Sequence, residues 1–190
     1  SRKNMPEYIV NKENIIYNLL TIRKCAAGRE IIAVLKCGAY GLGLERMEKL
    51  LYTGGVRRFA ITELADALRL RSLHKETEIL LMNPLYDEEK IAKAAEAGIT
   101  LTLSSPENAA AVNRACVIAG VFAAAHIAVD TGLGRYGFLP RQTAEITDVY
   151  CRLGGIRVTG LYSHAYDPGD RRATERQMAA LSEVIARLRA

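Results

Sequence analysis

Short runs of branched apolar residues alternate along the chain with longer segments of mixed polarity. The apolar runs cover residues 31–35, 58–61, 78–82, 99–103, 125–129 and 158–162. Their length and continuous apolar character are typical of short strands that are buried on both faces of a sheet. They recur about every 20 to 30 residues, the spacing of alternating strands and helices in a parallel sheet.

Helix signals fill the segments between these runs. Asn11 can cap one helix, and Ser105 followed by Pro106 begins another. Apolar spacing and acidic first turns indicate the remaining helices. The predicted helices cover residues 12–25, 63–73, 87–97, 106–118 and 174–190. The last one places on a single apolar face Met178, Leu181, Ile185 and Leu188.

The pattern predicts an α/β fold of the parallel (β/α) TIM-barrel type, truncated at about six βα units. A closed barrel of this type has eight strands, so residues 1–190 are interpreted as one incomplete barrel domain without its last strands. An open parallel sheet leaves two strand edges unpaired. We therefore expect the chain to self-associate or to be completed by other material.

Composition restricts the possible partners. The formal charge is +5, but the Lys and Arg residues are scattered and few aromatic residues lie between them, which argues against nucleic-acid binding. The apolar runs are shorter than the roughly 20 residues that a membrane helix needs, and the first residues lack the pattern of a secretory signal. A cytoplasmic protein that contacts neither nucleic acid nor membrane is expected.

Four cysteines, Cys25, Cys37, Cys116 and Cys151, are widely spaced. This spacing suggests neither a zinc site nor a disulfide framework, and no metal is assigned to the protein. We expect reduced thiols, with all except Cys37 packing as small hydrophobic residues.

A lysine ends the first predicted strand. Lys36 follows the apolar run 31–35 and precedes the glycine-rich segment 38–43. The carboxyl ends of barrel strands form the active-site face, where a partly desolvated amine can attack an aldehyde and form a Schiff base. The glycines allow the backbone to turn sharply beside a ligand.

Two further motifs end the fifth and sixth predicted strands, at residues 129–138 and 160–165. Because these strand ends meet at one face of a barrel, we expect Lys36, Arg135 and His164 to line one pocket. His74 follows a helix and should be solvated, and His126 begins a strand at the opposite end. Neither of these histidines is assigned to the site.

The motifs resemble those of the alanine racemase family. Residues 33–43, AVLKCGAYGLG, are similar to the family's AVVKANAYGHG, and residues 130–138, DTGLGRYGF, to its DTGMGRLGF. Residues 160–165, GLYSHA, are similar to GLYTHF, and residues 59–68 also match a family segment. The resemblance covers about residues 7–190.

The resemblance implies a pyridoxal phosphate enzyme of fold type III that interconverts L- and D-amino acids. It implies that Lys36 holds the cofactor as an aldimine and acts as one of two opposed acid/base groups. Arg135 would donate to the phenolic oxygen of the cofactor, His164 would lie beside its ring, and Tyr40 near its phosphate. The implied enzyme is an isomerase, namely an alanine racemase that makes a D-amino acid for cell wall precursors. The resemblance also implies a homodimer.

The chain departs from the family at three positions. Ala128 replaces a lysine that is often carbamylated and orients the arginine, Leu42 replaces a histidine, and Gly38 an asparagine. These differences put alanine as the substrate in question.

Other family parts lie outside the sequence. In the family, the phosphate-binding serine and a second arginine come from the last barrel strands, and the second acid/base, a tyrosine, comes from a C-terminal β domain of the partner subunit. We therefore expect these 190 residues alone to be inactive as a racemase, since one acid/base group serves one face of the α-carbon. Two alternatives remain: a non-catalytic cofactor carrier or regulatory module, and a fold type III amino acid decarboxylase.

Overall fold

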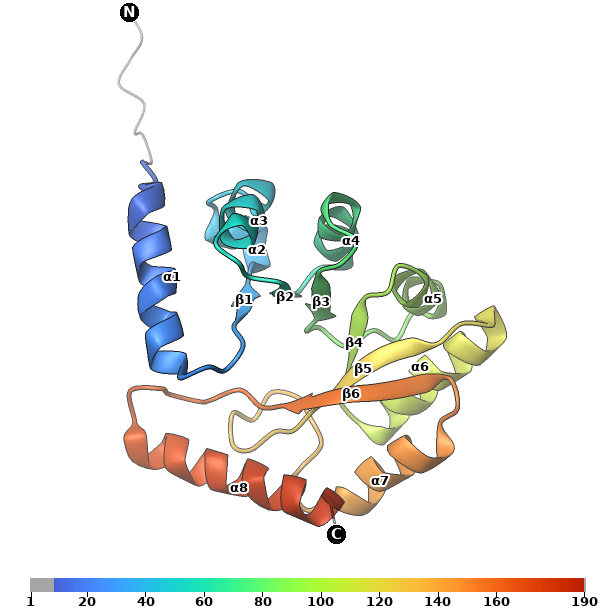
Figure 1. The fold of residues 1–190 in the computed structure, drawn as a ribbon. Helices are drawn as coiled ribbons and strands as arrows, with labels where there is room; N and C mark the ends of the chain where they lie inside the picture. The colour runs from blue at the N-terminus through green and yellow to red at the C-terminus, as the bar shows by residue number, and fades with distance from the viewer. Residues whose placement is uncertain (1–8, 190) are drawn as a thin grey trace, which may run out of the picture.

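The computed structural model describes residues 9–189. Six parallel strands form one sheet in which each strand pairs with the next along the chain (Figure 1). They are β1 (Ile32–Val34), β2 (Arg58–Ile61), β3 (Glu78–Leu81), β4 (Thr100–Leu103), β5 (Ala123–Ala128) and β6 (Ile156–Tyr162). Every predicted strand is present, with ends within two residues of the apolar run, so the parallel α/β organisation is confirmed.

Burial follows the position of each strand in the sheet. The last three residues of β2, β3 and β4 are all buried, because helices cover one face and the curved sheet closes over the other. β1 is an edge strand, and its residues Ile32 and Val34 are exposed. β1 and β6 are therefore the two outer strands of the sheet, as expected for an open sheet of six strands.

The helices follow the strands around the outside of the curved sheet (Figure 1). Asn11, Asp87 and Ser105 cap three of them by accepting a hydrogen bond from the backbone N–H three residues later, at 3.0, 2.9 and 3.1 Å. The sequence did not predict α3 and α7. The helices that flank the sheet are α1 (Lys12–Ala26), α3 (Leu44–Thr53), α4 (Leu64–Leu73), α5 (Glu88–Glu96), α6 (Pro106–Ala119), α7 (Thr143–Arg152) and α8 (Arg171–Arg189).

The packed face of α8 differs from the predicted one. Met178 was expected on that face, but it is 56% exposed, and Gln177 and Val184 are the buried residues of the helix. Leu181 and Leu188 pack against the core as partly buried neighbours. The face is therefore rotated by about one residue, and it includes a polar side chain.

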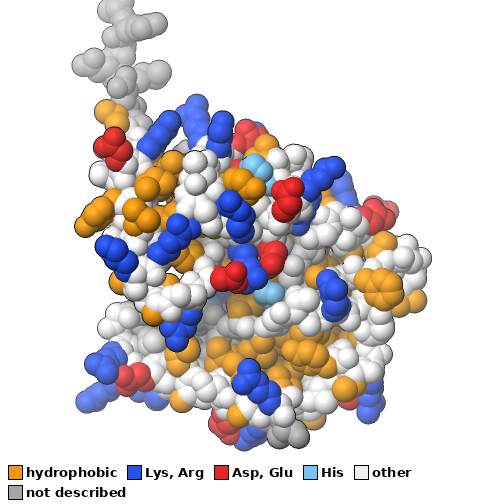
Figure 2. Space-filling view, in the orientation of Figure 1, with side chains coloured by type: hydrophobic (Ala, Val, Ile, Leu, Met, Phe, Trp, Pro, Cys, Tyr) orange, Lys and Arg blue, Asp and Glu red, His pale blue; other side chains and the backbone are white. Residues whose placement is uncertain are grey.

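The exposure of the cysteines differs from the prediction, whereas the surface charges are mixed as expected. Only Cys116 is buried among the four cysteines, so the expectation that Cys25 and Cys151 pack as hydrophobic residues was wrong. On the face seen in Figure 2, Lys and Arg side chains are interspersed with acidic and uncharged ones. Within residues 9–189, no helix combines the length and the apolar character needed to cross a membrane.

Candidate active site

The chain leaves β1 through a left-handed turn. The strand ladder extends to Leu35, whose N–H donates to the carbonyl of Ala60 at 3.0 Å. α2 (Lys36–Tyr40) follows, with φ of 53°, 61°, 58° and 56° at residues 37–40. A left-handed conformation costs about 1–2 kcal/mol for each residue other than glycine. Strain of this kind persists where the surrounding structure holds it, and it gathers at functional sites.

Backbone hydrogen bonds and burial hold this turn. The N–H of Ala39 donates to the carbonyl of Leu35 at 3.2 Å, and the N–H of Gly41 donates to that of Cys37 at 3.1 Å. The methyl group of Ala39 is buried in the core. The turn therefore fixes the direction in which Lys36 leaves the strand end.

Lys36 and Tyr40 lie at the two ends of the turn. Lys36 is half-buried, and its Nζ lies 5.9 Å from the centroid of the Tyr40 ring, within the range of a cation–π contact. Tyr40 is 61% exposed. The ring therefore stands beside the amine and leaves one of its own faces to solvent.

The loop after β5 is closed by its own backbone. The N–H of Asp130 donates to the carbonyl of Phe138 at 2.9 Å, and the N–H of Phe138 donates to that of Ala128 at 2.8 Å. A Cβ at Gly137 would lie 2.7 Å from the backbone nitrogen of Asp130, closer than side chains approach. The closed loop holds Arg135 at the carboxyl end of β5.

The carboxylate of Asp130 organises the inside of this loop. Its Oδ1 accepts hydrogen bonds from the N–H groups of Gly132 and Gly134, both at 3.0 Å. Burial raises the pKa of the carboxyl group, but the surrounding backbone N–H groups outweigh this effect and hold the pKa below its usual value. Asp130 is therefore an internal anchor of the loop.

A small pocket joins this loop to the end of β6. Its free volume is about 10 Å³, close to the space that one water molecule needs, so a larger ligand would lie over its mouth. Arg135 stands at the pocket with its guanidinium carbon 4.7 Å from the centroid of the Tyr136 ring. The lining consists of Ala128, Val129, Asp130, Leu133, Arg135, Tyr136, Tyr162, Ser163 and His164.

Two tyrosines connect the pocket to the barrel interior, and sequence reasoning missed both. The hydroxyl of Tyr136 donates to the carbonyl of Met82 at 2.9 Å, and that of Tyr162 bonds to Oγ1 of Thr102 at 3.0 Å. Burial raises the pKa of the Tyr162 phenol, which stays protonated. The position of Tyr162 as the last residue of a strand was the available signal.

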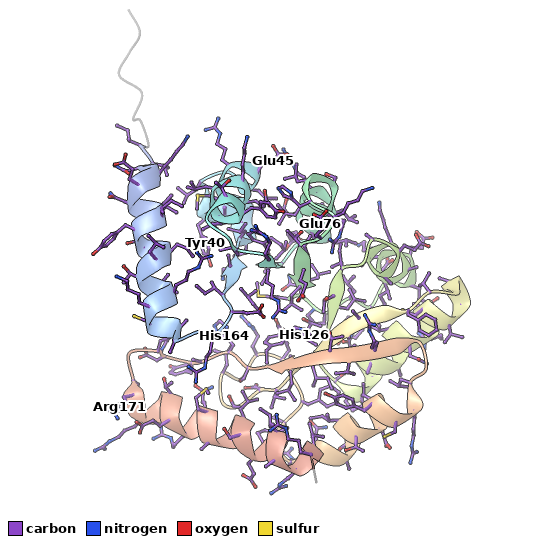
Figure 3. The ribbon with its side chains drawn as sticks, viewed as in Figure 1. Tyr40, Glu45, Glu76, His126, His164 and Arg171 are labelled. Atoms are coloured by element: carbon purple, nitrogen blue, oxygen red, sulfur yellow. The ribbon has the colours of Figure 1, made fainter. Side chains whose placement is uncertain are left out.

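His164 lies in the same pocket lining as Arg135. Partial burial, the charge of Arg135 and the charge of Lys36 all lower the pKa of the imidazole, in that order. Arg135 shares the pocket lining with His164, whereas Lys36 lies outside that lining. Lys36, Arg135 and His164 follow β1, β5 and β6, so all three lie at the carboxyl ends of parallel strands, and Figure 3 shows His164 on the chain between β6 and α8.

The small side chain of Ala128 cannot orient Arg135. It is buried at the end of β5, and a methyl group has no polar atom to hold a guanidinium. Arg135 is held from another side, by the ring of Tyr136.

The other two histidines lie outside the site lining. His74 is half-buried, with Nε2 3.3 Å from Oε1 of buried Glu48, and its ring stacks on Tyr52 at 3.9 Å. The expectation that His74 is solvated was therefore wrong. His126 lies within β5, and burial is the largest of the causes that lower its pKa.

A larger cavity lies at the opposite ends of the strands. It has a volume of about 330 Å³ and is lined at the amino ends of β1 and β2 by residues that include Arg23, Arg29, Arg57 and Arg58. Its lining contains no lysine, histidine, serine or cysteine. It therefore lacks a side chain suited to nucleophilic attack on an aldehyde.

Comparison with known proteins identifies alanine racemases as relatives of this chain. Residues 10–190 match the family model for the alanine racemase N-terminal domain. Alanine racemase of Desulforamulus reducens is 35% identical over 184 residues, which are 94% of this chain and 49% of that protein. Alanine racemase of Methanococcus maripaludis is 35% identical over 152 residues, 79% of this chain and 40% of that protein.

Solved structures agree in fold and supply the barrel assignment. Alanine racemase of Clostridium difficile 630 aligns with a TM-score of 0.79 at 26% identity, over 93% of this chain and 46% of that one. Histidine racemase of Leuconostoc mesenteroides aligns with a TM-score of 0.79 at 29% identity, over 91% and 47%. The chain spans about half the length of the curated relatives it matches. On this evidence, the chain belongs to the family of alanine racemase N-terminal domains.

Proposed function

We propose that this chain is the cofactor-bearing barrel portion of a pyridoxal phosphate-dependent amino acid racemase, with alanine as the first substrate to test. The observation that carries the proposal is the placement of an amine, a guanidinium and an imidazole at the carboxyl ends of three parallel strands, with Arg135 and His164 in one pocket lining. Family membership supports the reaction class.

The residues present fit this cofactor. Pyridoxal phosphate offers an aldehyde and carries negative charge on its phosphate and its phenolic oxygen. Burial, and after it the positive charges of Arg135 and Lys36, lower the pKa of His164, and the nearby carboxylate of Asp130 is turned toward backbone N–H groups. An anionic aldehyde would compensate this charge and would meet a half-buried amine.

Each side chain has a distinct task in the proposal. When bound, the cofactor supplies an electron sink for negative charge at the α-carbon of an amino acid. Lys36 would hold the cofactor through Nζ and would move the α-proton on one face. Arg135 would donate to the phenolic oxygen and favour its anionic form, His164 would lie beside the ring, and Tyr40 near the phosphate.

Racemisation needs a second acid/base group on the opposite face of the α-carbon. We propose that this group comes from a partner subunit in a homodimer of the full-length protein. The 190 residues alone should then show no racemase turnover. The name of the histidine racemase neighbour supports testing a panel of amino acids, as does the departure of this chain from the family at Ala128 and Leu42.

A non-catalytic cofactor carrier is the second candidate, and the departures at Ala128 and Leu42 favour it. The test incubates the full-length protein with pyridoxal phosphate and L-amino acids in deuterium oxide. A racemase incorporates deuterium at the α-carbon and forms the D-amino acid, whereas a carrier binds the cofactor and does neither.

The cofactor site is tested separately with borohydride reduction and peptide mapping. We expect the adduct on Lys36 and its loss in Lys36→Ala, with Lys93→Ala as the control, since Lys93 is exposed on α5. An adduct that maps to another lysine would overturn the proposal.

A further inference from the structure

Gln177 is a buried polar residue on the packed face of α8. It is 8% exposed and lies two turns before Val184, the other buried residue of the helix. An apolar side chain is the usual occupant of such a position. Burial of a carboxamide is unfavourable unless its donors and its acceptor are satisfied.

The carboxamide is satisfied by the two loops that form the candidate site. Its Nε2 donates to Oγ1 of Thr131 and to the carbonyl of His164, both at 3.2 Å. Its Oε1 accepts from the N–H of Tyr166 at 2.8 Å. One side chain of α8 therefore connects the loop after β5 with the loop after β6.

A second bond joins the same loops next to this contact. Oγ1 of Thr131 and Oγ of Ser163 lie 2.7 Å apart. Gly132 lies next to Gln177: a Cβ added at Gly132 would lie 3.5 Å from Cγ of Gln177. The contact set needs two donors and one acceptor on one short side chain. Glutamate lacks the donors, and methionine lacks both.

We propose that Gln177 is a positioning residue that sets the backbone of His164 against the loop carrying Arg135. Gln177 acts through the Thr131 hydroxyl and the His164 carbonyl. It does not hydrogen-bond the guanidinium of Arg135 or the imidazole of His164. The consequence for cofactor binding rests on the function proposed above. The positioning itself is independent of the cofactor and is tested without it.

The first test is an NMR titration of the His164 ring in the full-length protein without added cofactor, with His164→Gln used to assign the signal. Gln177→Met keeps the length of the side chain and removes its hydrogen bonds. Burial lowers the pKa of the ring most, followed by the charges of Arg135 and Lys36. Released from Gln177, the ring should become more exposed and move away from these cations. The pKa should then rise toward the ordinary value of about 6.5.

Val184→Ala is the matched control, because it weakens the packing of α8 without breaking a polar contact. It should lower stability and leave the His164 titration unchanged. An unchanged titration in Gln177→Met, or an equal change in Val184→Ala, would overturn the proposal. If Gln177→Met does not fold, Gln177→Glu serves instead, since it retains the acceptor for Tyr166 and loses the donor to the His164 carbonyl.

The second test measures pyridoxal phosphate affinity from the absorbance of the bound cofactor. We expect binding on the order of ten-fold weaker in Gln177→Met than in the unmodified protein or in Val184→Ala. If the unmodified protein does not bind the cofactor, the proposed function fails and the titration still decides the role of Gln177. If the cofactor binds and Gln177→Met matches the unmodified protein in both tests, the positioning role alone fails.

Discussion

The glycines of the loop after β5 allow a graded test of how rigidly this loop is built. Gly137→Ala places a Cβ 2.7 Å from the Asp130 nitrogen, 3.0 Å from the Ala128 carbonyl oxygen and 3.1 Å from the Val129 carbonyl carbon, at a φ of +133°. All three neighbours are backbone atoms, so no side chain can move aside to relieve the contact.

The expected magnitude follows from two contributions. A sparsely populated backbone conformation costs on the order of 1–3 kcal/mol, and forced contact with a packed surround costs about 1–3 kcal/mol more. Gly137→Ala should therefore lower the free energy of unfolding by about 2–6 kcal/mol. Gly134→Ala isolates the first contribution, because φ is +74° and no atom lies within 4 Å, and about 1–2 kcal/mol is expected.

Gly154→Ala, just before β6 and outside this loop, is the control. Gly154 has neither a positive φ nor a neighbour within 4 Å of an added Cβ. Its effect should lie within about 0.5 kcal/mol of zero or be slightly stabilising. Urea unfolding of the full-length protein, followed by circular dichroism, measures all three. A Gly137→Ala variant no less stable than Gly134→Ala would refute the account of a loop closed by its own backbone.

Three further predictions, each measured by urea unfolding, test other parts of the structure. Cys37→Gly should stabilise the protein by about 0.5–1 kcal/mol by relieving its φ of 53°, whereas Cys25→Gly within α1 should destabilise it by a few tenths; the same sign in both would argue against strain in the turn. Burial raises the pKa of Glu48 above its ordinary 4.5 despite the neighbouring His74. The folded state then holds the Glu48 proton more tightly, and stability falls as pH rises through that raised pKa; Glu48→Gln should remove this fall, and an unchanged pH profile would contradict it. The pKa of Asp130 lies below its ordinary 3.8 because backbone N–H groups outweigh burial, so its contribution is present above pH 3.8 and is lost as pH falls through the lowered pKa. Asp130→Asn should lower stability at pH 7 and lose this acid-side decline, and equal stability at pH 7 would count against the anchoring role.

Local sequence signals were sufficient for the regular elements. Runs of branched residues marked the strands because helices and the curved sheet bury both faces, as at Ile79 and Leu101. Asn11 and Ser105 marked helix starts because their side chains accept the N–H three residues later. The candidate site residues could be assigned to one end of the sheet because the carboxyl ends of parallel strands lie on the same side.

Features that depend on tertiary contacts were not accessible in this way. The left-handed turn after Lys36 contains non-glycine residues and is held partly by the burial of Ala39. His74 becomes half-buried because Glu48, distant in the sequence, lies beside it. The face of α8 was misjudged because hydrophobicity favours Met178 over Gln177, whose partners lie on two other loops.

A crystal structure of the full-length protein after addition of pyridoxal phosphate and borohydride reduction tests the central claim most directly. We predict a covalent bond from Nζ of Lys36 to the cofactor, the guanidinium of Arg135 on the phenolic oxygen, and the His164 imidazole against the ring. A cofactor bound instead in the arginine-lined cavity at the amino ends of β1 and β2, or attached to another lysine, would contradict the account.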